Sequence, residues 1–282
     1  MAEAYTDFAR VYDELMDATP YGEWCERIDR LIGTFGVTEP VNAVRDSAGW
    51  KEDENSPEGR DALLASERNL VVDLGCGTGT LTEMLYQKGY DMIGVDCSEA
   101  MLGIAEEKRS ESGSQILYLN QDMRELELYS TVGCVISVCD SLNYLLEEEE
   151  LAQVFAGVEN YLYPGGIFIF DFNTDYKYRE VIGDTIIAEN RDNCSFIWEN
   201  TYYAEEQINE YDLTIFVRKE GELYERFDET HLQRGYTPEC IKRLLEESHL
   251  QEVLMLDADT NGEVTGTSER ILVVAKEYRK TE

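Results

Sequence analysis

Three alternating glycines are the residues with the clearest chemical meaning in this sequence. They lie in VVDLGCGTGT, residues 71–80, where an apolar run ends at Asp73 and is followed by Gly75, Gly77 and Gly79. Glycine has no Cβ, so a turn with several glycines lets the backbone come close to a bound molecule. Glycine-rich turns after strands hold dinucleotides, nucleoside triphosphates or S-adenosylmethionine, and the turn by itself leaves these three ligands open.

The spacing within the turn argues against two of these ligands. The dinucleotide fingerprint is G-x-G-x-x-G, and Thr80 occupies the position of its last glycine. A phosphate-binding P-loop needs a lysine followed by serine or threonine, and no lysine lies in residues 71–80. The third ligand, S-adenosylmethionine, is the one that the spacing leaves.

Acidic residues follow each of the next three apolar runs. Asp96 ends the run MIGVD, Asp122 lies in NQDMREL, and Asp140 lies in CDSLNYL. In an open α/β sheet, ligands bind outside the carboxyl ends of the strands. Together with Asp73, these carboxylates are expected to surround one site, and they favour a cationic ligand there.

The segments VVDLGCGTGTLTEML, GVDCSEAML, NQDMREL and CDSLNYL occur in this order over residues 69–175. In that order they resemble the motifs of the class I S-adenosylmethionine-dependent methyltransferases. The resemblance implies S-adenosylmethionine as the cofactor. A nicotinamide oxidoreductase is an alternative for any glycine turn, and the missing third glycine argues against it.

The resemblance assigns a part of the cofactor to each acidic position. Asp96 would accept hydrogen bonds from both ribose hydroxyls, which one carboxylate can do. Asp122 would accept from the adenine amino group, and the backbone N–H of Met123 would meet a ring nitrogen. The ammonium group would bind carbonyl groups of the turn Gly75–Gly77, with Asp73 close by.

Four more residues in or beside these motifs complete the expected cofactor contacts, namely Cys76, Cys97, Met101 and Cys139. Structural explanations stay open for several members of the set. Asp73 and Asp122 are also typical turn residues, and Asp96 is also typical of a helix start. Met101, four residues after Cys97, is also typical of a residue packed in the core.

The N-terminal segment YTDFARVYDELMDATPYGEW resembles a small-molecule branch that includes glycine N-methyltransferase and the sugar N,N-dimethyltransferases. The resemblance implies a helical lid over the cofactor, with Tyr5, Phe8, Tyr12 and Trp24 reaching the site. The alternative for the two tyrosines is core packing, because apolar residues recur in this segment at the three- and four-residue spacing of one helix face.

Methyl transfer from a sulfonium is an in-line displacement with a good, neutral leaving group, so positioning matters most. A general base is needed where the nucleophile must lose a proton. The candidates are Tyr12, Asn143 and His231, and a strand histidine bonded to the backbone is the alternative for the last. CDSLNYL lacks the Asn/Asp-Pro-Pro-Tyr motif, which favours a small-molecule acceptor methylated at an amine nitrogen. O-methylation and cofactor binding without catalysis remain alternatives.

The alternation of short apolar runs with helical patterns predicts the frame for this site. We expect an α/β, Rossmann-like, mostly parallel seven-stranded sheet with helices on both faces. Alternating Thr, Ile, Tyr and Phe residues predict an antiparallel β insertion. The expected units are a helical lid (1–37), an acidic surface insertion (38–68), the methyltransferase core (69–175 and 236–282) and the β insertion over the acceptor pocket (176–235).

Composition limits the class of partner. The 282 residues carry 59 acidic and 24 basic side chains, a net charge of −35, which disfavours a nucleic-acid substrate. Seven scattered cysteines without a CxxC pair read as reduced thiols of a cytoplasmic protein. His231 and His249 lack metal-ligand spacing, so we expect no metal. We expect no membrane span and no signal peptide, and either a monomer or a homodimer.

Overall fold

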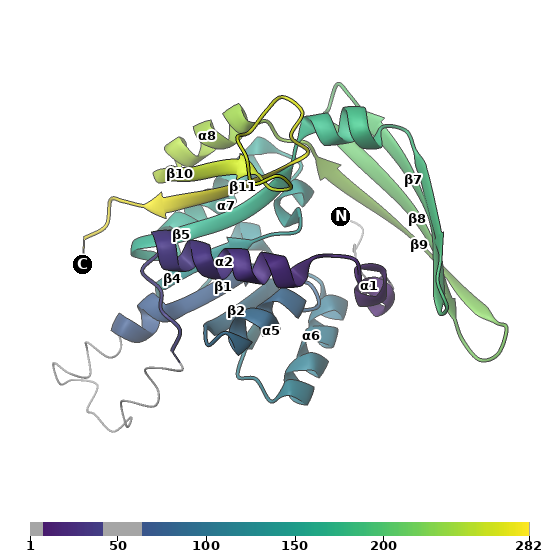
Figure 1. The fold of residues 1–282 in the computed structure, drawn as a ribbon, viewed down its shortest axis with the longest axis horizontal. Coiled ribbons are helices and arrows are strands. Elements are labelled where there is room, and N and C mark those ends of the chain that lie inside the picture. Colours follow the sequence, from purple (N-terminus) through teal and green to yellow (C-terminus); the bar gives the residue numbers. More distant parts are fainter. Residues whose placement is uncertain (1–7, 42–63, 282) are drawn as a thin grey trace.

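The computed structural model describes residues 8–41 and 64–281, and it contains two separate β-sheets (Figure 1). The larger sheet has seven strands in the order β10-β11-β5-β4-β1-β2-β3. Its strands are β1 (Leu70–Leu74), β2 (Asp91–Asp96), β3 (Leu117–Asn120), β4 (Val132–Ser137), β5 (Leu162–Asn173), β10 (Leu250–Asp257) and β11 (Arg270–Glu277). All neighbouring strands pair in parallel except those on either side of β11. The predicted fold class, a mostly parallel seven-stranded sheet, is confirmed.

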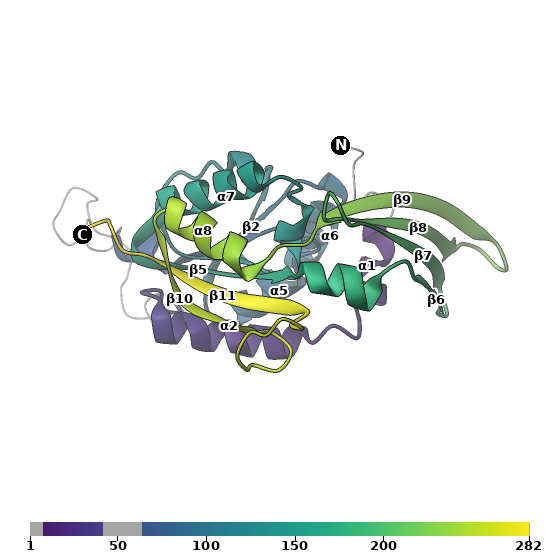
Figure 2. The ribbon, with the colours of Figure 1, turned by 90° about the horizontal axis from the view of Figure 1, so that it is seen from above.

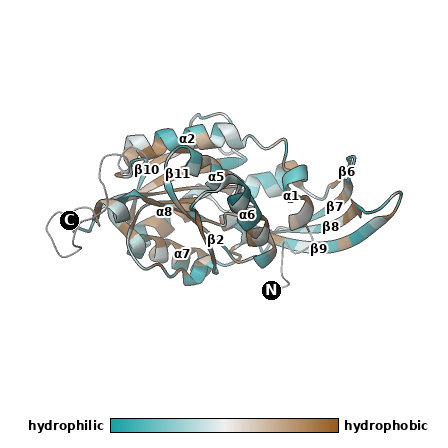
Figure 3. Ribbon diagram, turned by 90° about the horizontal axis from the view of Figure 1, so that it is seen from below, coloured by the Kyte–Doolittle hydropathy of each residue, from teal (hydrophilic) through white to brown (hydrophobic). Residues whose placement is uncertain are grey.

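Helices cover both faces of the larger sheet (Figure 2). One face carries α2 (Tyr21–Phe35), α5 (Thr80–Gln87) and α6 (Glu99–Ser112), and the other carries α7 (Glu148–Tyr161) and α8 (Pro238–Glu247). In β4, Val135 packs on the α7 side, while Cys134 and Ile136 pack on the α2 side. Because both faces are covered, the central strand β4 is buried along its whole length, and the middle of the sheet is mostly brown in Figure 3.

Side-chain caps fix the starts of two helices that flank the site. Ser98 precedes α6, and its Oγ accepts a hydrogen bond from the N–H of Met101 at 3.2 Å. Thr237 caps α8 in the same way, and Pro238 occupies the first helical position. These residue types satisfy backbone groups that a helix start leaves without partners.

The smaller sheet is antiparallel throughout and extends away from the core (Figure 1). Its strands are β6 (Ile186–Asn190), β7 (Cys194–Tyr203), β8 (Ile208–Arg218) and β9 (Tyr224–Arg234). The larger sheet leads into it through a single π-helical turn, η3 (Lys177–Ile182). Burial alternates along β8, so one face of this sheet is turned inward and the other outward. The predicted antiparallel insertion is confirmed.

The short helix α1 (Ala9–Leu15) lies on the inner face of the smaller sheet. Val11 packs there with Leu213 and Ile215. On its other side, the carboxylate of Asp13 accepts a hydrogen bond from Thr78 Oγ1 at 2.6 Å and pairs with Lys108 at 2.6 Å. Helix α1 therefore joins the antiparallel sheet to the glycine turn.

Helix α2 packs on the larger sheet as part of the core, which is not the position of a lid. Cys25, Ile28 and Ile32 are buried against the larger sheet, in one cluster with its strands. The amphipathic pattern of residues 21–35 thus reflects a covering layer of the core, which corrects the expectation that all of residues 1–37 form a lid. A lid role for α1 stays a prediction.

The expected acidic insertion lies mostly outside the described residues, which omit 42–63. Its two ends are held to the core. The N–H of Val41 donates to the Gly89 carbonyl at 2.8 Å, and Thr38 Oγ1 donates to the Arg68 carbonyl at 3.0 Å. In the parts of the chain that the structure describes, no helix is long and apolar enough to cross a membrane.

Candidate cofactor and acceptor site

The glycine turn follows β1 at the carboxyl edge of the sheet, between the ends of its neighbours β2 and β4. The backbone N–H groups of Gly75 and Cys76 both donate to the Val95 carbonyl, at 2.8 and 3.1 Å, which ties the turn to β2. Ser141 Oγ lies 3.3 Å from the Gly75 carbonyl oxygen and ties the turn to the segment after β4. The turn is therefore held from both sides.

The three glycines all have positive φ angles, of +75°, +54° and +73°, which other residues adopt at a cost. Their surroundings differ. A Cβ on Gly75 would lie 2.6 Å from Ser141 Oγ, and one on Gly79 would lie 2.4 Å from Tyr118 Oη. A Cβ on Gly77 would meet nothing within 4 Å. Gly75 and Gly79 are thus required by packing, and Gly77 borders open space at the carboxyl edge.

Asp96, at the end of β2, holds the turn from beside that space. Its Oδ2 accepts from the N–H of Gly77 at 2.8 Å, and its Oδ1 accepts from the N–H of Ser98 at 2.8 Å. Burial raises the pKa of this carboxyl above its usual value. The helix-start interpretation of Asp96 is therefore consistent with its contacts, and its ribose role stays a prediction.

Asp73 lies deeper, below the turn. Its Oδ2 accepts from Thr82 Oγ1 at 2.6 Å. Burial, with a smaller contribution from the charge of Asp96, raises the pKa of Asp73 to about 7. Among the described residues, neither Asp73 nor Asp96 forms an ion pair. Two such carboxylates at one edge fit a ligand that carries positive charge, as S-adenosylmethionine does on its ammonium and sulfonium groups.

Asp122, the expected acceptor for the adenine amino group, already has a side-chain partner. Arg124 Nε donates to Asp122 Oδ1 at 2.9 Å, and this hydrogen bond lowers the pKa of Asp122. An adenine amino group would therefore share the Asp122 carboxylate with Arg124. Met123 does lie beside the turn, with its methyl carbon 3.5 Å from the position of a Cβ on Gly75.

Three residues expected to contact the cofactor differ in burial. Met101 is only 2% exposed within α6, so core packing, the alternative left open for it, is what the structure shows. Cys97 is exposed, and its carbonyl accepts from Asn120 Nδ2 at 3.1 Å, which places it at the rim. Cys76 is half-buried within the turn itself.

The segment after β4 lies beside the glycine turn and has an uncommon backbone. Cys139 and Asp140 have φ angles of +64° and +53°. The Asp171 carboxylate accepts their N–H groups at 3.3 and 2.9 Å and so supports this uncommon backbone. Arg270 Nη2 donates to Asp140 Oδ1 at 2.9 Å, and Gln233 Nε2 donates to Asp140 Oδ2 at 2.8 Å.

Asp171 and Arg270 were not identified as site residues from the sequence. An acid inside the apolar strand GIFIFDF was a usable signal for Asp171, because a charge in a buried strand needs a partner. That partner is Arg270 at the start of β11, with Nη1 3.6 Å from Asp171 Oδ2. The pairing joins strands that are far apart in sequence, so spacing gives no sign of it.

Aromatic residues surround the end of β4. Tyr12 Oη lies 3.9 Å from Cys139 Sγ, and Phe8 packs edge-on against Tyr12. Burial raises the pKa of Tyr12 well above its usual value, and it raises that of Cys139 to about 12. Trp24 lies under the Arg270 guanidinium, 5.3 Å from it, at the wall of a cavity of about 150 Å³. Tyr5 lies outside the described residues.

Two of the catalytic candidates, Asn143 and His231, are buried. Asn143 is fully buried, its Nδ2 donates to the carbonyls of Asn173 and Arg234, and its Oδ1 accepts from the N–H of Asn173. Both ends of the amide are used in joining three segments, which corrects the expectation of a catalytic Asn143. His231 is 2% exposed on the inner face of the smaller sheet, where its Nδ1 lies 3.3 Å from Tyr144 Oη.

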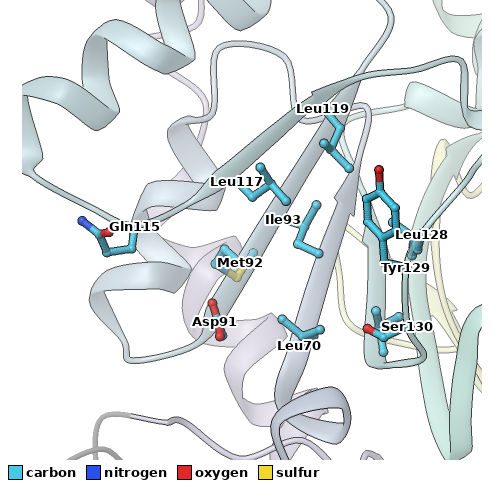
Figure 4. A pocket seen from close by; sticks show the side chains of 11 residues that line it. Leu70, Asp91, Met92, Ile93, Gln115, Leu117, Leu119, Leu128, Tyr129 and Ser130 are labelled. Carbon is cyan, nitrogen blue, oxygen red and sulfur yellow. The ribbon is translucent and has the colours of Figure 1, made fainter. Parts of the chain in front are cut away.

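A second cavity, of about 280 Å³, lies near the amino ends of the parallel strands (Figure 4). Leu70, Ile93 and Leu117 line it together with Tyr129 and Ser130. None of the residues of the glycine turn contributes to its wall. Because ligands in this class of sheet bind at the carboxyl ends, this apolar cavity is separate from the candidate site.

The chain is similar over nearly its whole length to proteins described as methyltransferases or putative methyltransferases. Residues 71–166 match a family model described as a methyltransferase domain. A putative methyltransferase of Geobacillus sp. (strain WCH70) is 35% identical, covering 96% of this chain and 99% of that protein. The putative methyltransferase YqeM of Bacillus subtilis (strain 168) is 33% identical, covering 98% of each chain.

Solved structures agree with this similarity. The crystal structure of an S-adenosylmethionine-dependent methyltransferase from Clostridium acetobutylicum ATCC 824 superposes with a TM-score of 0.77 at 30% identity, covering 98% of this chain and all of that one. The geometry at the carboxyl edge and the full-length similarity lead to one assignment. The chain belongs to the class I S-adenosylmethionine-dependent methyltransferases, and S-adenosylmethionine is its cofactor.

Proposed function

We propose that this enzyme methylates an amine nitrogen of a small molecule. The observation that carries the proposal is the enclosure of the β4 end, where Tyr12 of α1, Asp140 and the inner face of the antiparallel sheet lie around one place. A site enclosed in this way suits an acceptor of limited size. Asp140 is paired with Arg270, so the charge that favours an acceptor arriving as an ammonium ion is the net charge of −35 of the chain.

Names of relatives support nitrogen as the acceptor atom without excluding oxygen. A cypemycin N-terminal methyltransferase from Streptomyces sp is 28% identical over 221 residues. A dTDP-3-amino-3,4,6-trideoxy-alpha-D-glucopyranose N,N-dimethyltransferase from Streptomyces venezuelae is 32% identical over 106 residues. A ubiquinone biosynthesis O-methyltransferase of Methylococcus capsulatus is 38% identical over 100 residues. O-methylation is therefore the alternative outcome of the test below.

The cofactor roles expected of individual residues belong to the same proposal. Asp96 would accept from the ribose hydroxyls, and carbonyls of Gly75–Gly77 would accept from the ammonium group, with Asp73 below them. Asp122, shared with Arg124, would face the adenine. The cofactor supplies an electrophilic methyl group, and the residues of the chain bind, orient and exclude water.

The test uses deuteromethyl S-adenosylmethionine and two pools of acceptors. One pool holds amines, namely amino sugars, amino acids and peptides with a free N-terminus, and the other holds phenols and sugar alcohols without nitrogen. Mass spectrometry is expected to find deuteromethyl products and S-adenosylhomocysteine with the amine pool. Products only in the hydroxyl pool would contradict the choice of nitrogen. Asp96→Ala is the control that separates enzymatic from spontaneous transfer.

The assembly and the location of the enzyme also remain predictions. A monomer or a homodimer is expected, because the antiparallel sheet extends away from the core and its outer face carries exposed Ile197 and Tyr203. Light scattering on the purified chain distinguishes these states. A cytoplasmic location and the absence of a nucleic-acid substrate rest on composition alone.

A further inference from the structure

We propose that Tyr144, His231 and Glu229 form a relay that takes the proton from the acceptor nitrogen, with the Tyr144 phenol as the group that touches the acceptor. The proposal rests on the proposed function. It extends that function by adding two residues and by placing His231 behind the reacting atoms.

The first step of the relay is a contact between segments that are distant in sequence. Tyr144 ends η2 (Ser141–Tyr144), the turn that follows Cys139 and Asp140, and its Oη lies 3.3 Å from His231 Nδ1. The two rings meet edge to face with centroids 6.0 Å apart. The same turn contacts the glycine turn through Ser141. Tyr144 thus stands between the cofactor side and β9.

Exposure decides which member of the pair can meet the acceptor. The His231 side chain is 2% exposed, so a bound acceptor cannot touch the imidazole. Tyr144 is half-buried and belongs to η2, the turn that follows β4. The phenol therefore offers a path by which a proton from the site reaches His231.

Glu229 completes the relay on the far side of the imidazole. It lies two residues before His231, on the same face of β9, and its Oε2 is 3.3 Å from His231 Nε2. The Glu229 side chain is 6% exposed, and its Oε1 accepts from the N–H of Phe8 at 2.9 Å. The two atoms are at ion-pair distance without hydrogen-bond geometry, so the carboxylate acts on the imidazole through its charge, and this charge favours the proton on Nε2 and an Nδ1 that accepts from Tyr144.

Aromatic residues of two further elements lie around His231. On β8, Tyr211 is the cross-strand partner of His231 and lies on the same face. From α1, the Phe8 ring packs edge-on against the imidazole, and Tyr12 packs against Phe8. Among the described residues, Glu229 lies at ion-pair distance from the imidazole, where its charge stabilises an imidazolium.

The proton and electron balance of the step is complete. The acceptor ammonium gives its proton to Tyr144 Oη while the phenol proton moves to His231 Nδ1. The nitrogen lone pair then forms the N–C bond as the C–S bond breaks, which leaves S-adenosylhomocysteine. The imidazolium is held by Glu229 and later returns the proton to solvent by the same route.

The first test needs no acceptor. The chain contains only two histidines, and His249 is exposed after α8, so ¹⁵N-histidine labelling gives one reporter and one internal reference. Long-range ¹H–¹⁵N spectra are expected to show His231 protonated on Nε2 and unprotonated on Nδ1 at neutral pH. Tyr144→Phe should shift the Nδ1 resonance, and Glu229→Gln should populate the second tautomer. A His231 protonated on Nδ1 in the wild type would overturn the relay.

The second test uses the amine that the wild type methylates in the pool experiment. Tyr144→Phe is expected to lower kcat about 100-fold, the lower range for loss of a general base, with the affinity for S-adenosylmethionine within about twofold. Less basic amines, which are already neutral, should be affected less. An equal loss for all amines, or a weaker cofactor affinity, would show a structural role instead.

A matched control separates the relay from general damage to the sheet. Tyr203→Phe removes a phenol from the exposed outer face of the same antiparallel sheet, 43% exposed, and should leave kcat unchanged. If the wild type methylates no amine, the proposed function fails, and the spectra still decide the geometry of the relay. If it does and Tyr144→Phe retains full kcat, only the relay fails.

Discussion

At the scale of single residues, the proposed role of Asp96 in cofactor binding can be tested most directly. Its carboxylate already accepts two backbone N–H groups, so it is fixed in place beside the open space at Gly77. Asp96→Ala should weaken S-adenosylmethionine binding by about 1–3 kcal/mol, the scale for lost charged hydrogen bonds. Calorimetry measures the loss, and Asp91→Ala, at the other end of β2, is the control. Equal affinities of the two folded variants would refute the role.

Gly77 allows a sharper comparison. Gly77 and Gly113 both have positive φ angles, and a Cβ at either would meet nothing within 4 Å. Valine at either position should therefore cost similar stability through backbone strain. Gly77→Val should in addition abolish cofactor binding, because the new side chain would enter the ligand space. Gly113→Val, at the end of α6, should bind normally in the same calorimetric titration. Normal binding by Gly77→Val would move the cofactor elsewhere.

Asn143 shows where residue type misled the sequence analysis. An amide after the fourth strand is a reasonable catalytic group, but its three backbone hydrogen bonds were invisible in the sequence. Asn143→Ala would leave buried carbonyls without partners and should lower the free energy of unfolding by about 2–4 kcal/mol. Urea titration measures this. Unchanged stability with lost activity would restore the catalytic interpretation.

At the scale of elements, α1 is the helix whose proposed lid role depends on its position. It is held to the glycine turn by Asp13, through Thr78 and Lys108. Asp13→Ala should increase amide hydrogen exchange in residues 9–15 and weaken cofactor binding about threefold to tenfold, a loss on the scale of one hydrogen bond. Glu23→Ala, on the exposed side of α2, is the control. Unchanged exchange in α1 would show that Asp13 does not hold the helix.

The helices and strands could be predicted from the sequence better than their positions in the fold. Buried parallel strands appear as continuous apolar runs, and the acids at their ends mark the carboxyl edge, so β1, β2 and β4 could be found from sequence. Helix α2 could not be placed, because an amphipathic pattern is the same for a lid and for a core layer. The Tyr144–His231 contact spans 87 residues and has no local signal.

The whole molecule is expected to respond to pH through Asp73. Its pKa of about 7 exceeds the unfolded value of about 3.9, so the folded state holds the proton more tightly. The stabilisation is present below the unfolded value and is lost as pH rises through about 7. Asp73→Asn removes this dependence, so its stability relative to wild type should improve by about 2 kcal/mol between pH 5.5 and 8. Parallel unfolding curves at both pH values would contradict the buried, unpaired state of Asp73.

The central claim concerns the atom that receives the methyl group. S-adenosylmethionine labelled with ¹³C in its methyl group is incubated with the enzyme and the amine and hydroxyl pools together, and the product is examined by carbon NMR. We predict label in a methyl carbon bonded to nitrogen, with coupling to ¹⁵N when the amine is labelled. Label in a methyl carbon bonded to oxygen would contradict it.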